Sequence, residues 1–422
     1  MLDSNKYSVR QIRFSNGERY PLLFDEYGQP LWFPTLFATT QFRNASKASN
    51  TMAAVLSAIR VLMAWSDLSD INLDSRFARR AFLNELEIES LWRHTQTKNV
   101  GSGEKQLILI RKKRGQESAR DMVQTIDSRV SGMTHYIRIS YIADYLEWFA
   151  IRIVEREAKL VDEVTLEQIK RMVKSLRLRR PQKSHPSTIF ARRGLTESQQ
   201  EILLGMVKRG SVNNPFSSEQ QGRNQLIVLL LYFLGLRAGE LLALRISDFN
   251  LQENTLVIAR RHDNPNDSRT YQPVVKTADR RIALSEGLIS TVWDYVRYER
   301  SKLPAAKKHE FLFVTHQAGP FKGKPFSIKG LAKVFFEIQS AMPNELGGLS
   351  PHVLRHTAND RFSAQMDKKA VGSAEEEKLR SYLMGWKEGS GTSATYTRRH
   401  TEMRAKEAAL NLQSSGWKNK NG

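Results

Sequence analysis

A basic, proline-containing stretch divides the sequence into two halves with different patterns. The segment RLRRPQKSHPSTIFARRG, residues 177–194, holds two prolines and six basic residues and no acidic residue. Proline and runs of like charge are typical of segments that connect domains. A chain of 422 residues is long enough for two or three domains with separate cores. We therefore expect a basic linker at 181–194 between two domains.

The half before this linker has mainly helical patterns. Alternating segments in residues 1–30, with turns at Asn16–Gly17 and Tyr27–Gly28, predict an N-terminal extension of strands or a hairpin. Apolar residues at helical spacing then predict helices that begin at Ser49 and that span 79–94, 134–155 and 165–178. A basic insertion at 100–117 interrupts them with a Gly/Ser turn, a strand-like LILI and the run RKKR. We expect residues 31–180 to form one α-helical domain.

The half after the linker mixes helices with strands. Helices are predicted at 196–208, 222–235, 286–301, 327–341, 350–366, 374–385 and 400–413. Strands are predicted at Thr255–Ala259, Tyr271–Val275 and Arg280–Leu284. This order predicts a mixed α/β domain at 195–399, mainly helical with a small antiparallel sheet, followed by a C-terminal helix and tail at 400–422.

The charge balance favours a polyanionic partner. Lys and Arg outnumber Asp and Glu by 65 to 44, which gives a net charge of +21 and a pI near 10.0. An excess of this size points to nucleic acid first and to acidic membrane surfaces second. The basic linker is then either a solvated spacer or a set of phosphate contacts between two basic domains.

Several absences narrow the class of protein. No apolar run approaches the roughly 20 residues that a membrane span needs. The start MLDSNKYSVR lacks the apolar region of a signal peptide. The absence of cysteine excludes a disulfide framework and Cys-based zinc sites. We expect a cytoplasmic protein that does not associate with a membrane.

One arginine lies in an otherwise apolar run, LYFLGLRAGELLALR at residues 231–245. Burying the guanidinium of Arg237 is costly unless an anionic group pairs with it. Glu240, three residues further along, is one candidate partner. A single carboxylate cannot occupy every donor of the guanidinium, so we expect some of them to be held ready for an anionic ligand.

Four stretches of the second half together resemble a known catalytic domain. GLRAGELLALR carries Arg237 and Glu240, VVKTADRRIAL carries Lys276 at a strand-to-strand turn, LSPHVLRHTAND opens a helix with Ser350 as its cap, and YLMGWKEGSGTSATYTRRH carries Trp386 and Tyr396. This order resembles that of the tyrosine recombinases, the phage-integrase family: an Arg in a G-L-R-x-x-E context, a Lys in a β-turn, an H-x-L-R-H helix, a His or Trp, and then a Tyr. The resemblance covers residues 195–400, and the helical first half is similar to the core-binding domain of that family.

The resemblance implies that DNA strands are broken and rejoined without a cofactor. Tyr396 would attack the scissile phosphorus and leave a 3′-phosphotyrosyl link and a free 5′-hydroxyl. Arg237 and Arg355 would hold the two non-bridging oxygens of the phosphate. Lys276 would protonate the leaving 5′-oxygen, with Lys322 and Lys324 in a glycine-flanked loop as alternatives to it.

Further residues complete the implied site. His352 would accept the tyrosine proton or hold the phosphate, and Trp386 would donate its indole N–H. Glu240 and His356 would support these groups. His352 and His356 also have the i, i+4 spacing of a helical zinc site, but Arg355 lies between them and no third ligand is evident, so we expect no metal. Two details of the Trp386–Tyr396 segment matter: it is slightly longer than is usual in the family, and the preceding Tyr382 is a weaker nucleophile candidate.

The resemblance also implies double-stranded DNA as the partner, held in a C-shaped clamp between the two domains. Candidate DNA contacts are the basic residues of the insertion, the linker region and the loop at 260–270: Arg111, Lys112, Lys113, Arg114, Arg179, Arg180, Lys183, Arg192, Arg193, Arg260 and Arg261. That loop is either a mobile hairpin tip or a contact with DNA.

Assembly of several protomers is a further implication. Four protomers would form a tetramer that pairs two recombination sites, with sister recombinases or accessory DNA-bending proteins as additional partners. The helix at 400–413 either folds back on its own domain or, as the resemblance suggests, docks on a neighbouring protomer. The outcome would be integration, excision or transposition of a mobile element.

Two other classes share parts of this pattern. A hairpin telomere resolvase or a type IB topoisomerase uses the same Arg, Lys, His and Tyr set, and a decayed active site would leave a DNA-binding regulator. We favour the recombinase because a docking helix after Tyr396 suits an assembly and because all the expected catalytic side chains are present.

Overall fold

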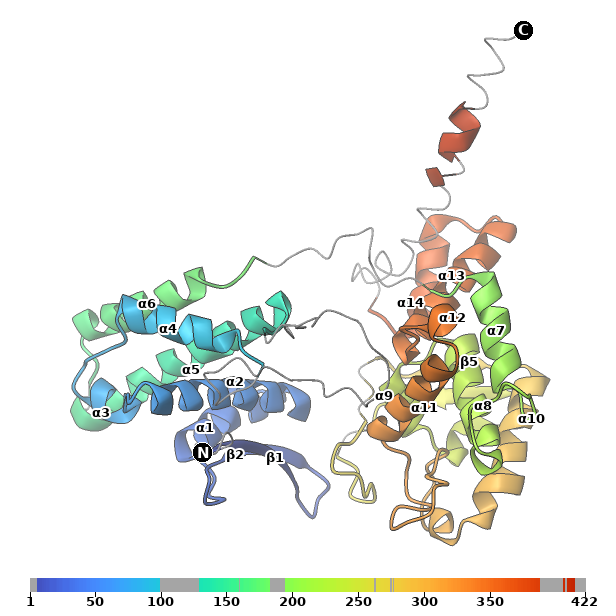
Figure 1. The fold of residues 1–422 in the computed structure, drawn as a ribbon, viewed down its shortest axis with the longest axis horizontal. Helices are drawn as coiled ribbons and strands as arrows, with labels where there is room; N and C mark the ends of the chain where they lie inside the picture. Colours follow the sequence, from blue (N-terminus) through green and yellow to red (C-terminus); the bar gives the residue numbers. More distant parts are fainter. Residues whose placement is uncertain are drawn as a thin grey trace, which may run out of the picture. The chain divides into compact units, whose positions relative to one another are not determined.

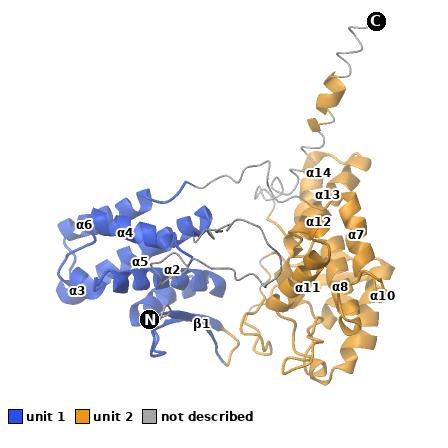
Figure 2. Ribbon diagram, viewed as in Figure 1, with its two compact units in different colours: residues 1–14, 19–189 blue, residues 15–18, 190–422 orange. Residues whose placement is uncertain are grey.

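The structure of the chain is a computed structural model. It describes residues 6–98, 129–158, 160–182, 194–261, 263–273, 275, 277–387, 405–406 and 408–413. The chain divides into two compact units (Figure 2): unit 1 takes in residues 1–14 and 19–189, and unit 2 takes in residues 15–18 and 190–422. The division after residue 189 falls within the sequence segment that we interpret as a linker.

Unit 1 begins with an antiparallel hairpin. β1 (Ser8–Arg13) pairs with β2 (Arg19–Phe24), so that the first residue of β1 lies opposite the last residue of β2. Both predicted turns are confirmed, since Asn16–Gly17 joins the two strands and Tyr27–Gly28 follows β2. Side chains of β2 enter the core of the unit, so this extension is packed as part of unit 1.

The rest of unit 1 is helical. Its helices are α1 (Trp32–Phe37), the π-helix η1 (Ala38–Arg43), α2 (Ser49–Leu68), α3 (Leu73–Ala78), α4 (Glu85–Thr95), α5 (Gly132–Ala158) and α6 (Glu163–Leu178) (Figure 1). The helices predicted from Ser49, at 134–155 and at 165–178 are confirmed as α2, α5 and α6. The helix predicted at 79–94 is wrong at its start, because Arg80 has a left-handed backbone with φ of 59°. α4 begins later because Asn84 and Glu87 form a reciprocal capping box.

The core of unit 1 lies between α2 and α5. Val55, Leu56 and Ile59 of α2 pack with Ile142 and Leu146 of α5. α2 is long and apolar enough, by length and composition, to cross a membrane, which corrects the expectation that no segment reaches that length. However, 50% of this apolar window is buried inside the unit, which is also the pattern of a core helix.

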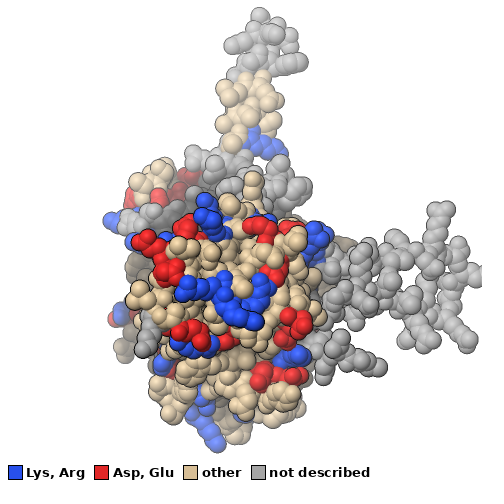
Figure 3. All heavy atoms as spheres, turned by 90° about the vertical axis from the view of Figure 1, so that its left-hand side faces the viewer, with Lys and Arg blue, Asp and Glu red and all other residues tan. Residues whose placement is uncertain are grey.

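Basic and acidic side chains lie interspersed over the face drawn in Figure 3. Unit 1 contains several pairs of this kind, among them Arg80–Asp162 at 2.8 Å and Arg156–Asp74 at 2.9 Å. Pairs between exposed charges contribute little to stability. Their effect is to neutralise individual arginines, so the net positive charge of the chain does not by itself mark a binding surface.

Unit 2 is mainly helical with a small antiparallel sheet, as predicted. Its helices are α7 (Glu197–Val207), α8 (Ser218–Leu234), α9 (Ala238–Ala243), η3 (Ile246–Asp248), α10 (Glu286–Asp294), η4 (Tyr295–Glu299), η5 (Arg300–Lys302), η6 (Pro304–Lys308), α11 (Ile328–Ala341), α12 (Pro343–Leu346), α13 (Pro351–Lys368) and α14 (Ser373–Met384). The residues described near the C-terminus, 405–406 and 408–413, are helical as well. The long helices predicted from apolar spacing are therefore confirmed to within a few residues.

The sheet of unit 2 has the order β3 (Phe249–Asn250), β4 (Thr255–Ile258) and β5 (Arg280–Ala283). β4 lies in the middle and is antiparallel to both neighbours. The predicted strands that begin at Thr255 and Arg280 are confirmed. The strand predicted at Tyr271–Val275 is wrong: the residues described there form no strand, and β3 and β5 occupy both edges of β4. Pro273 also lacks the N–H that an inner strand must donate.

One core joins the elements that carry the candidate site. α8 and α13 pack side by side, with Leu226 and Leu230 of α8 and Leu354 of α13 all 0% exposed. Leu256 of β4 and Ile282 of β5 belong to the same core. Because close-packed interiors hold their side chains in fixed positions, the end of α8, the start of α13 and the start of β5 are fixed relative to one another.

Candidate active site

Arg237 lies where the chain turns from one helix into the next. α8 ends at Gly235, whose left-handed φ of 60° redirects the chain, and α9 begins directly after Arg237. A Cβ at position 235 would also lie 3.1 Å from the Ala358 side chain, so glycine suits both the turn and the packing. The Arg237 side chain is 32% exposed. Its Nη1 lies 3.4 Å from Glu240 Oε1 and 3.5 Å from the carbonyl oxygen of Met384.

Glu240 is buried and has a stronger partner than the one expected from the sequence. Arg280 Nη2 lies 2.9 Å from Glu240 Oε2, and both side chains are at most 1% exposed. The hydroxyl of Thr277 donates to Glu240 Oε1 at 2.6 Å, and the backbone N–H of Arg237 donates to Oε2 at 3.0 Å. Burial raises the pKa of Glu240, but the Arg280 charge and the hydrogen bonds it accepts outweigh burial and leave the pKa below its ordinary value. The carboxylate is therefore ionised, and the side chain of Arg237 makes only a long contact with it, at 3.4 Å.

Arg355 is held by backbone carbonyls from two other helices. α13 begins with Ser350 as its cap and Pro351 in its first turn, as predicted. The side chain of Arg355, which follows one turn later, is 1% exposed. Its Nη1 donates to the carbonyl of Gly235 at 2.6 Å, and its Nη2 donates to that of Met384 at 3.0 Å. The ends of α8 and α14 therefore fix the plane of this guanidinium.

His352, His356 and Trp386 surround Arg355. His352 is exposed in the first turn of α13, where the helix dipole adds partial positive charge. His356 is buried, and its ring lies edge-to-face with that of His352 at 4.7 Å. Trp386 is 8% exposed, and its ring centre lies 5.3 Å from the Arg355 guanidinium carbon. Among the described residues there is no group of three or more His, Asp or Glu side chains that could hold a metal ion.

Three successive carbonyls at the end of α14 receive donors from the site. Arg280 Nε donates to the carbonyl of Leu383 at 2.7 Å. Arg355 and Arg237 both donate to the carbonyl of Met384. The backbone N–H of Ala278 donates to the carbonyl of Gly385 at 3.3 Å. A helix end normally leaves its last carbonyls without intrahelical partners. Here the carbonyls of Leu383 and Met384 accept hydrogen bonds from the guanidinium groups of the site.

A second buried arginine attaches α14 to α13. Arg380 is 0% exposed and donates to the carbonyl of Asn359 at 3.2 Å and to the hydroxyl of Ser363 at 2.6 Å. It also forms an ion pair with Glu376. α14 ends at Met384, only four residues after Arg380. The contacts of Arg380 therefore fix the position of the Met384 carbonyl that accepts a hydrogen bond from Arg355.

The sequence prediction missed Arg280, Thr277 and Arg380 as members of this arrangement. For Arg280 a signal was present, because Arg280 and Ile282 share one face of the predicted strand and Ile282 is apolar. In the structure the residues of β5 alternate between buried and exposed, with Arg280 buried. An arginine on the inward face of a strand requires an internal anion. Nothing in the local pattern identified Glu240 as that anion.

Of the predicted catalytic set, the structure brings together Arg237, Arg355, His352 and Trp386, with Glu240 and His356 as neighbours. Several predicted residues lie outside the described residues: Lys276, Tyr396, Arg111, Lys112, Lys113, Arg114, Lys183, Arg192 and Arg193. Their roles stay predictions.

Among the predicted DNA contacts, Arg179 and Arg180 have partners within unit 1. Arg179 Nη2 donates to Glu85 Oε2 at 2.6 Å. The guanidinium carbon of Arg180 lies 5.1 Å from the ring centre of Tyr136. Both side chains therefore have defined positions at the end of α6. They would contact DNA either from these positions or after breaking their contacts with Glu85 and Tyr136.

The loop at 260–270 is anchored at several points. Asp267 is 0% exposed, and Arg269 donates to the carbonyls of Leu242 and Phe326 at 2.9 Å each. Near its start, Arg261 forms an ion pair with the buried carboxylate of Asp248. Asp267 and Arg269 are buried, whereas Asp263, Asn266 and Ser268 are exposed, so only part of the loop is anchored to the body of unit 2. Both interpretations of the loop, a mobile hairpin tip or a contact with DNA, stay predictions. Contact of Arg260 and Arg261 with DNA stays a prediction.

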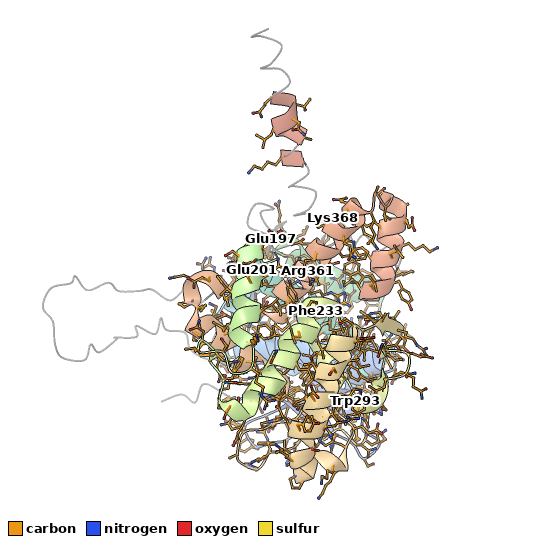
Figure 4. All side chains as sticks on the ribbon, turned by 90° about the vertical axis from the view of Figure 1, so that its right-hand side faces the viewer. Glu197, Glu201, Phe233, Trp293, Arg361 and Lys368 are labelled. Atoms are coloured by element: carbon orange, nitrogen blue, oxygen red, sulfur yellow. The ribbon has the colours of Figure 1, made fainter. Side chains whose placement is uncertain are left out.

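A groove of about 590 Å³ lies on unit 2 between α7, α8, α13 and α14. Phe233 and Arg361 line it and lie next to each other in Figure 4, with the guanidinium carbon 5.3 Å from the ring centre. Phe233 is 48% exposed although it is apolar. Leu383 and Met384 also line the groove. The groove therefore lies beside the end of α14, whose Met384 carbonyl accepts from Arg237 and Arg355.

Comparison with known proteins places the chain in a family. Residues 193–403, half of the chain, match the phage integrase family. The chain belongs to the phage integrase family, which confirms the resemblance inferred from the sequence motifs. The match includes every predicted catalytic position from Arg237 to Tyr396.

Individual relatives match over shorter stretches. Transposase A from transposon Tn554 of Staphylococcus aureus strain N315 is 33% identical over 168 residues, which cover 38% of this chain and 43% of that protein. Tyrosine recombinase XerD of Halalkalibacterium halodurans is 27% identical over 165 residues, which cover 39% of this chain and 46% of that protein. The chain thus spans less than half the length of each of these relatives.

Solved structures with a similar fold have low sequence identity. The Tn1549 transposon integrase in complex with circular intermediate DNA has a TM-score of 0.36 at 16% identity and covers 60% of this chain and 80% of its own. The XerH site-specific recombinase bound to a palindromic difH substrate, in a post-cleavage complex, has a TM-score of 0.43 at 15% identity and covers 90% and 94%.

Proposed function

We propose that this chain is a site-specific DNA recombinase that cuts and rejoins strands through a 3′-phosphotyrosyl intermediate. The observation that carries the proposal is the convergence of Arg237 and Arg355, from separate helices, on the carbonyl of Met384. Two guanidinium groups beside an exposed His352 suit a phosphodiester, whose charge lies on its non-bridging oxygens. Membership of the phage integrase family and similarity to transposase A of Tn554 and to XerD support this class of reaction.

The reaction exchanges one phosphodiester bond for another. The Tyr396 oxygen attacks the scissile phosphorus, the bond to the 5′-oxygen breaks, and the 3′-phosphate remains on the tyrosine. Lys276 gives a proton to the leaving 5′-oxygen, and His352 accepts the Tyr396 proton or holds the phosphate. A 5′-hydroxyl from the partner strand then reverses the step, so the reaction needs no cofactor.

The two arginines have different parts in this reaction. Arg237 is partly exposed and holds the non-bridging oxygens from the open side of the site. Arg355 is almost fully buried and donates to two carbonyls. It would bind a phosphate oxygen either with the N–H groups that do not face those carbonyls or by giving up one of the two hydrogen bonds. A lysine has no planar fork and cannot make both sets of contacts.

The proposed partner is double-stranded DNA held by both units. The net charge of +21 favours a polyanion. The basic residues of the insertion at 100–117 and of the linker at 181–194 would contact phosphates, together with Arg179, Arg180, Arg260 and Arg261. The units would close around one duplex as a clamp, with unit 1 as the core-binding domain.

Recombination also requires assembly, and we place a tetramer on two DNA sites. The C-terminal helix would dock on a neighbouring protomer, because Leu410 and Leu412 are 53% and 74% exposed. The groove beside Phe233, which is lined by both apolar and polar side chains, is the proposed acceptor on the neighbouring protomer. Accessory DNA-bending proteins or sister recombinases would join this complex.

A covalent-trapping experiment tests the proposal. The full chain is first used to select binding fragments from the DNA that flanks its own gene, and the selected site is then nicked beside the scissile position. Wild-type protein is expected to form a stable protein–DNA adduct. Tyr396→Phe should form none, whereas Tyr382→Phe should match wild type, since Tyr382 donates its hydroxyl to the carbonyl of Arg281 on the outside of α14. Equal adduct formation by Tyr396→Phe would refute the nucleophile assignment.

The products separate this proposal from related reactions. Exchanged strands between two marked duplexes are expected for a recombinase. Hairpin ends would indicate a telomere resolvase, and relaxation of supercoils without site preference would indicate a type IB topoisomerase. Binding without an adduct would indicate a DNA-binding regulator.

A further inference from the structure

Arg280 lies at the centre of the contacts that hold the candidate site together. The whole residue is 4% exposed, and its side chain points from the inward face of β5 into the interior of unit 2. Its guanidinium donates to Glu240, to the hydroxyl of Thr277 and to the carbonyl of Leu383. These acceptors belong to α9, to the segment before β5 and to the end of α14, so one side chain joins three parts of the unit.

The first two contacts form a closed triangle of buried groups. Arg280 Nη2 lies 2.9 Å from Glu240 Oε2, and Arg280 Nη1 lies 3.1 Å from Thr277 Oγ1. Thr277 in turn donates to Glu240 Oε1 at 2.6 Å. Thr277 directly follows Lys276, the proposed proton donor, in the sequence, so the triangle fixes the residue next to that lysine. Glu240 accepts from the backbone of Arg237, so the same triangle fixes that arginine.

The third contact extends the network to the other arginine. Arg280 Nε donates to the carbonyl of Leu383 at 2.7 Å, and the next carbonyl, of Met384, accepts from Arg355. The backbone at Gly385 lies very close to Arg280 and Thr277, because a Cβ added at Gly385 would lie 2.7 Å from both Arg280 Nη1 and the Cβ of Thr277. A shift of Arg280 therefore moves the end of α14.

We infer that Arg280 is a positioning residue for strand cleavage, which sets the geometry of Arg237, of Arg355 and of Thr277, the residue that follows Lys276. The inference rests on the proposed function. The Nε, Nη1 and Nη2 atoms of Arg280 each donate to an acceptor of the protein, so Arg280 acts through these neighbours and not on the phosphate itself. Its planar guanidinium donates in three directions at once, whereas a lysine would place one ammonium on Glu240 and leave the Leu383 carbonyl without its donor.

The test compares Arg280→Lys with a matched control on the same strand. Arg281 is the next residue, points to the opposite face and forms an ion pair with Glu253 at 2.9 Å in which both side chains are more than half exposed. Arg281→Gln is expected to leave DNA affinity and single-turnover cleavage of the nicked site unchanged. Arg280→Lys is expected to bind the site within about threefold of wild type and to cleave it about 100-fold more slowly, because small displacements of reacting groups have effects of that size.

A second substrate separates positioning from a general loss of structure. If the scissile 5′-oxygen is replaced by sulfur, the leaving group departs without a proton, because a thiol is far more acidic than an alcohol. The deficit of Arg280→Lys should then shrink at least about tenfold, since part of it comes from the displaced lysine. A merely weakened fold would slow both substrates equally.

The outcomes are distinct. A folded Arg280→Lys that cleaves the oxygen substrate at the wild-type rate, or that shows equal deficits on both substrates, overturns the inference. If this variant does not fold by circular dichroism, Thr277→Val takes its place. It removes the two edges of the triangle that the Thr277 hydroxyl makes and keeps the Arg280–Glu240 pair, and the same relief by sulfur is required of it. If wild-type protein forms no adduct with either substrate, the proposed function itself fails.

Discussion

Arg237 and Arg355 donate to the same acceptor, the carbonyl oxygen of Met384, at 3.5 and 3.0 Å. The first arrives from the start of α9 and the second from α13, and their side chains are 32% and 1% exposed. The end of a helix carries partial negative charge, so two cations can meet there without a second carboxylate. In the sequence, Met384 is followed by Trp386 and then by Tyr396, so this helix end precedes the segment of the proposed nucleophile and also accepts from the two proposed phosphate-binding groups.

The difference in burial predicts different effects for the two arginines. Arg237→Lys should lower cleavage by about 100- to 1000-fold and change the free energy of unfolding by less than about 1 kcal/mol. Arg355→Lys should lower cleavage similarly and also destabilise unit 2 by about 1–3 kcal/mol, because the carbonyl of Gly235 or Met384 loses its donor. Cleavage assays and urea unfolding measure these effects. Arg209 is 63% exposed, and Arg209→Lys keeps a positive charge beside Glu299, so this variant should alter neither quantity. Equal stability losses for Arg237→Lys and Arg355→Lys would contradict the assignment.

Glu240→Gln should strongly destabilise unit 2, by about 3–5 kcal/mol, because it leaves the Arg280 charge buried without a counter-charge. The folded-state pKa of Glu240 lies below its ordinary value of 4.5, so its carboxylate stabilises the fold above that pH and loses this effect as the pH falls through the folded-state pKa. The stability gap between wild type and variant should therefore be largest at neutral pH and narrow in acid. A gap that is constant between pH 7 and pH 3 would show that the charge of Glu240 is unimportant.

Gly385→Ala tests the close approach between α14 and Arg280. Gly385 has a left-handed φ of 63°, and an added Cβ would meet Arg280 and Thr277 at 2.7 Å. Gly348 is a matched control, since it has a φ of 79° and nothing within 4 Å of an added Cβ. Gly348→Ala should cost about 1 kcal/mol for the backbone conformation alone, and Gly385→Ala about 1–3 kcal/mol more through overpacking. The cleavage rate should fall only for Gly385→Ala. Equal stability losses and equal cleavage rates for the two variants would mean that Arg280 and Thr277 move aside for the added methyl group at little cost.

His316 should make unit 2 less stable in mild acid. Burial, with the Arg223 charge as a second cause, lowers its pKa from 6.5 to about 4. The ring lies 3.2 Å from the Tyr295 hydroxyl and 2.9 Å from the carbonyl of Glu219. Since the unfolded chain takes up a proton near pH 6.5 and the folded one does not, His316 should reduce stability by about 3 kcal/mol as the pH falls from 6.5 to 4. NMR titration of the ring gives the pKa, and His316→Gln should flatten the pH dependence; a ring that titrates near 6.5 in the folded protein would disprove the burial effect.

Local patterns were sufficient for most helices and for the motifs that define the family. α2, α5, α6, α8, α11, α13 and α14 follow from apolar spacing and caps, because helix formation depends on residues within one or two turns. The strand predicted at Tyr271–Val275 shows the limit of such patterns: a β-strand needs a free edge on another strand, and β3 and β5 already occupy both edges of β4.

The order of residues along the chain also indicated that Arg237, Arg355 and His352 act together, because each motif carries its own residue types. It did not show which groups hold them. Arg280 and Glu240 are 40 residues apart, and Arg355 and the carbonyl of Gly235 are 120 apart. Such partners are chosen by how the helices and the sheet pack, since a buried guanidinium takes whichever acceptors the fold brings within hydrogen-bond distance, and no local spacing encodes that choice.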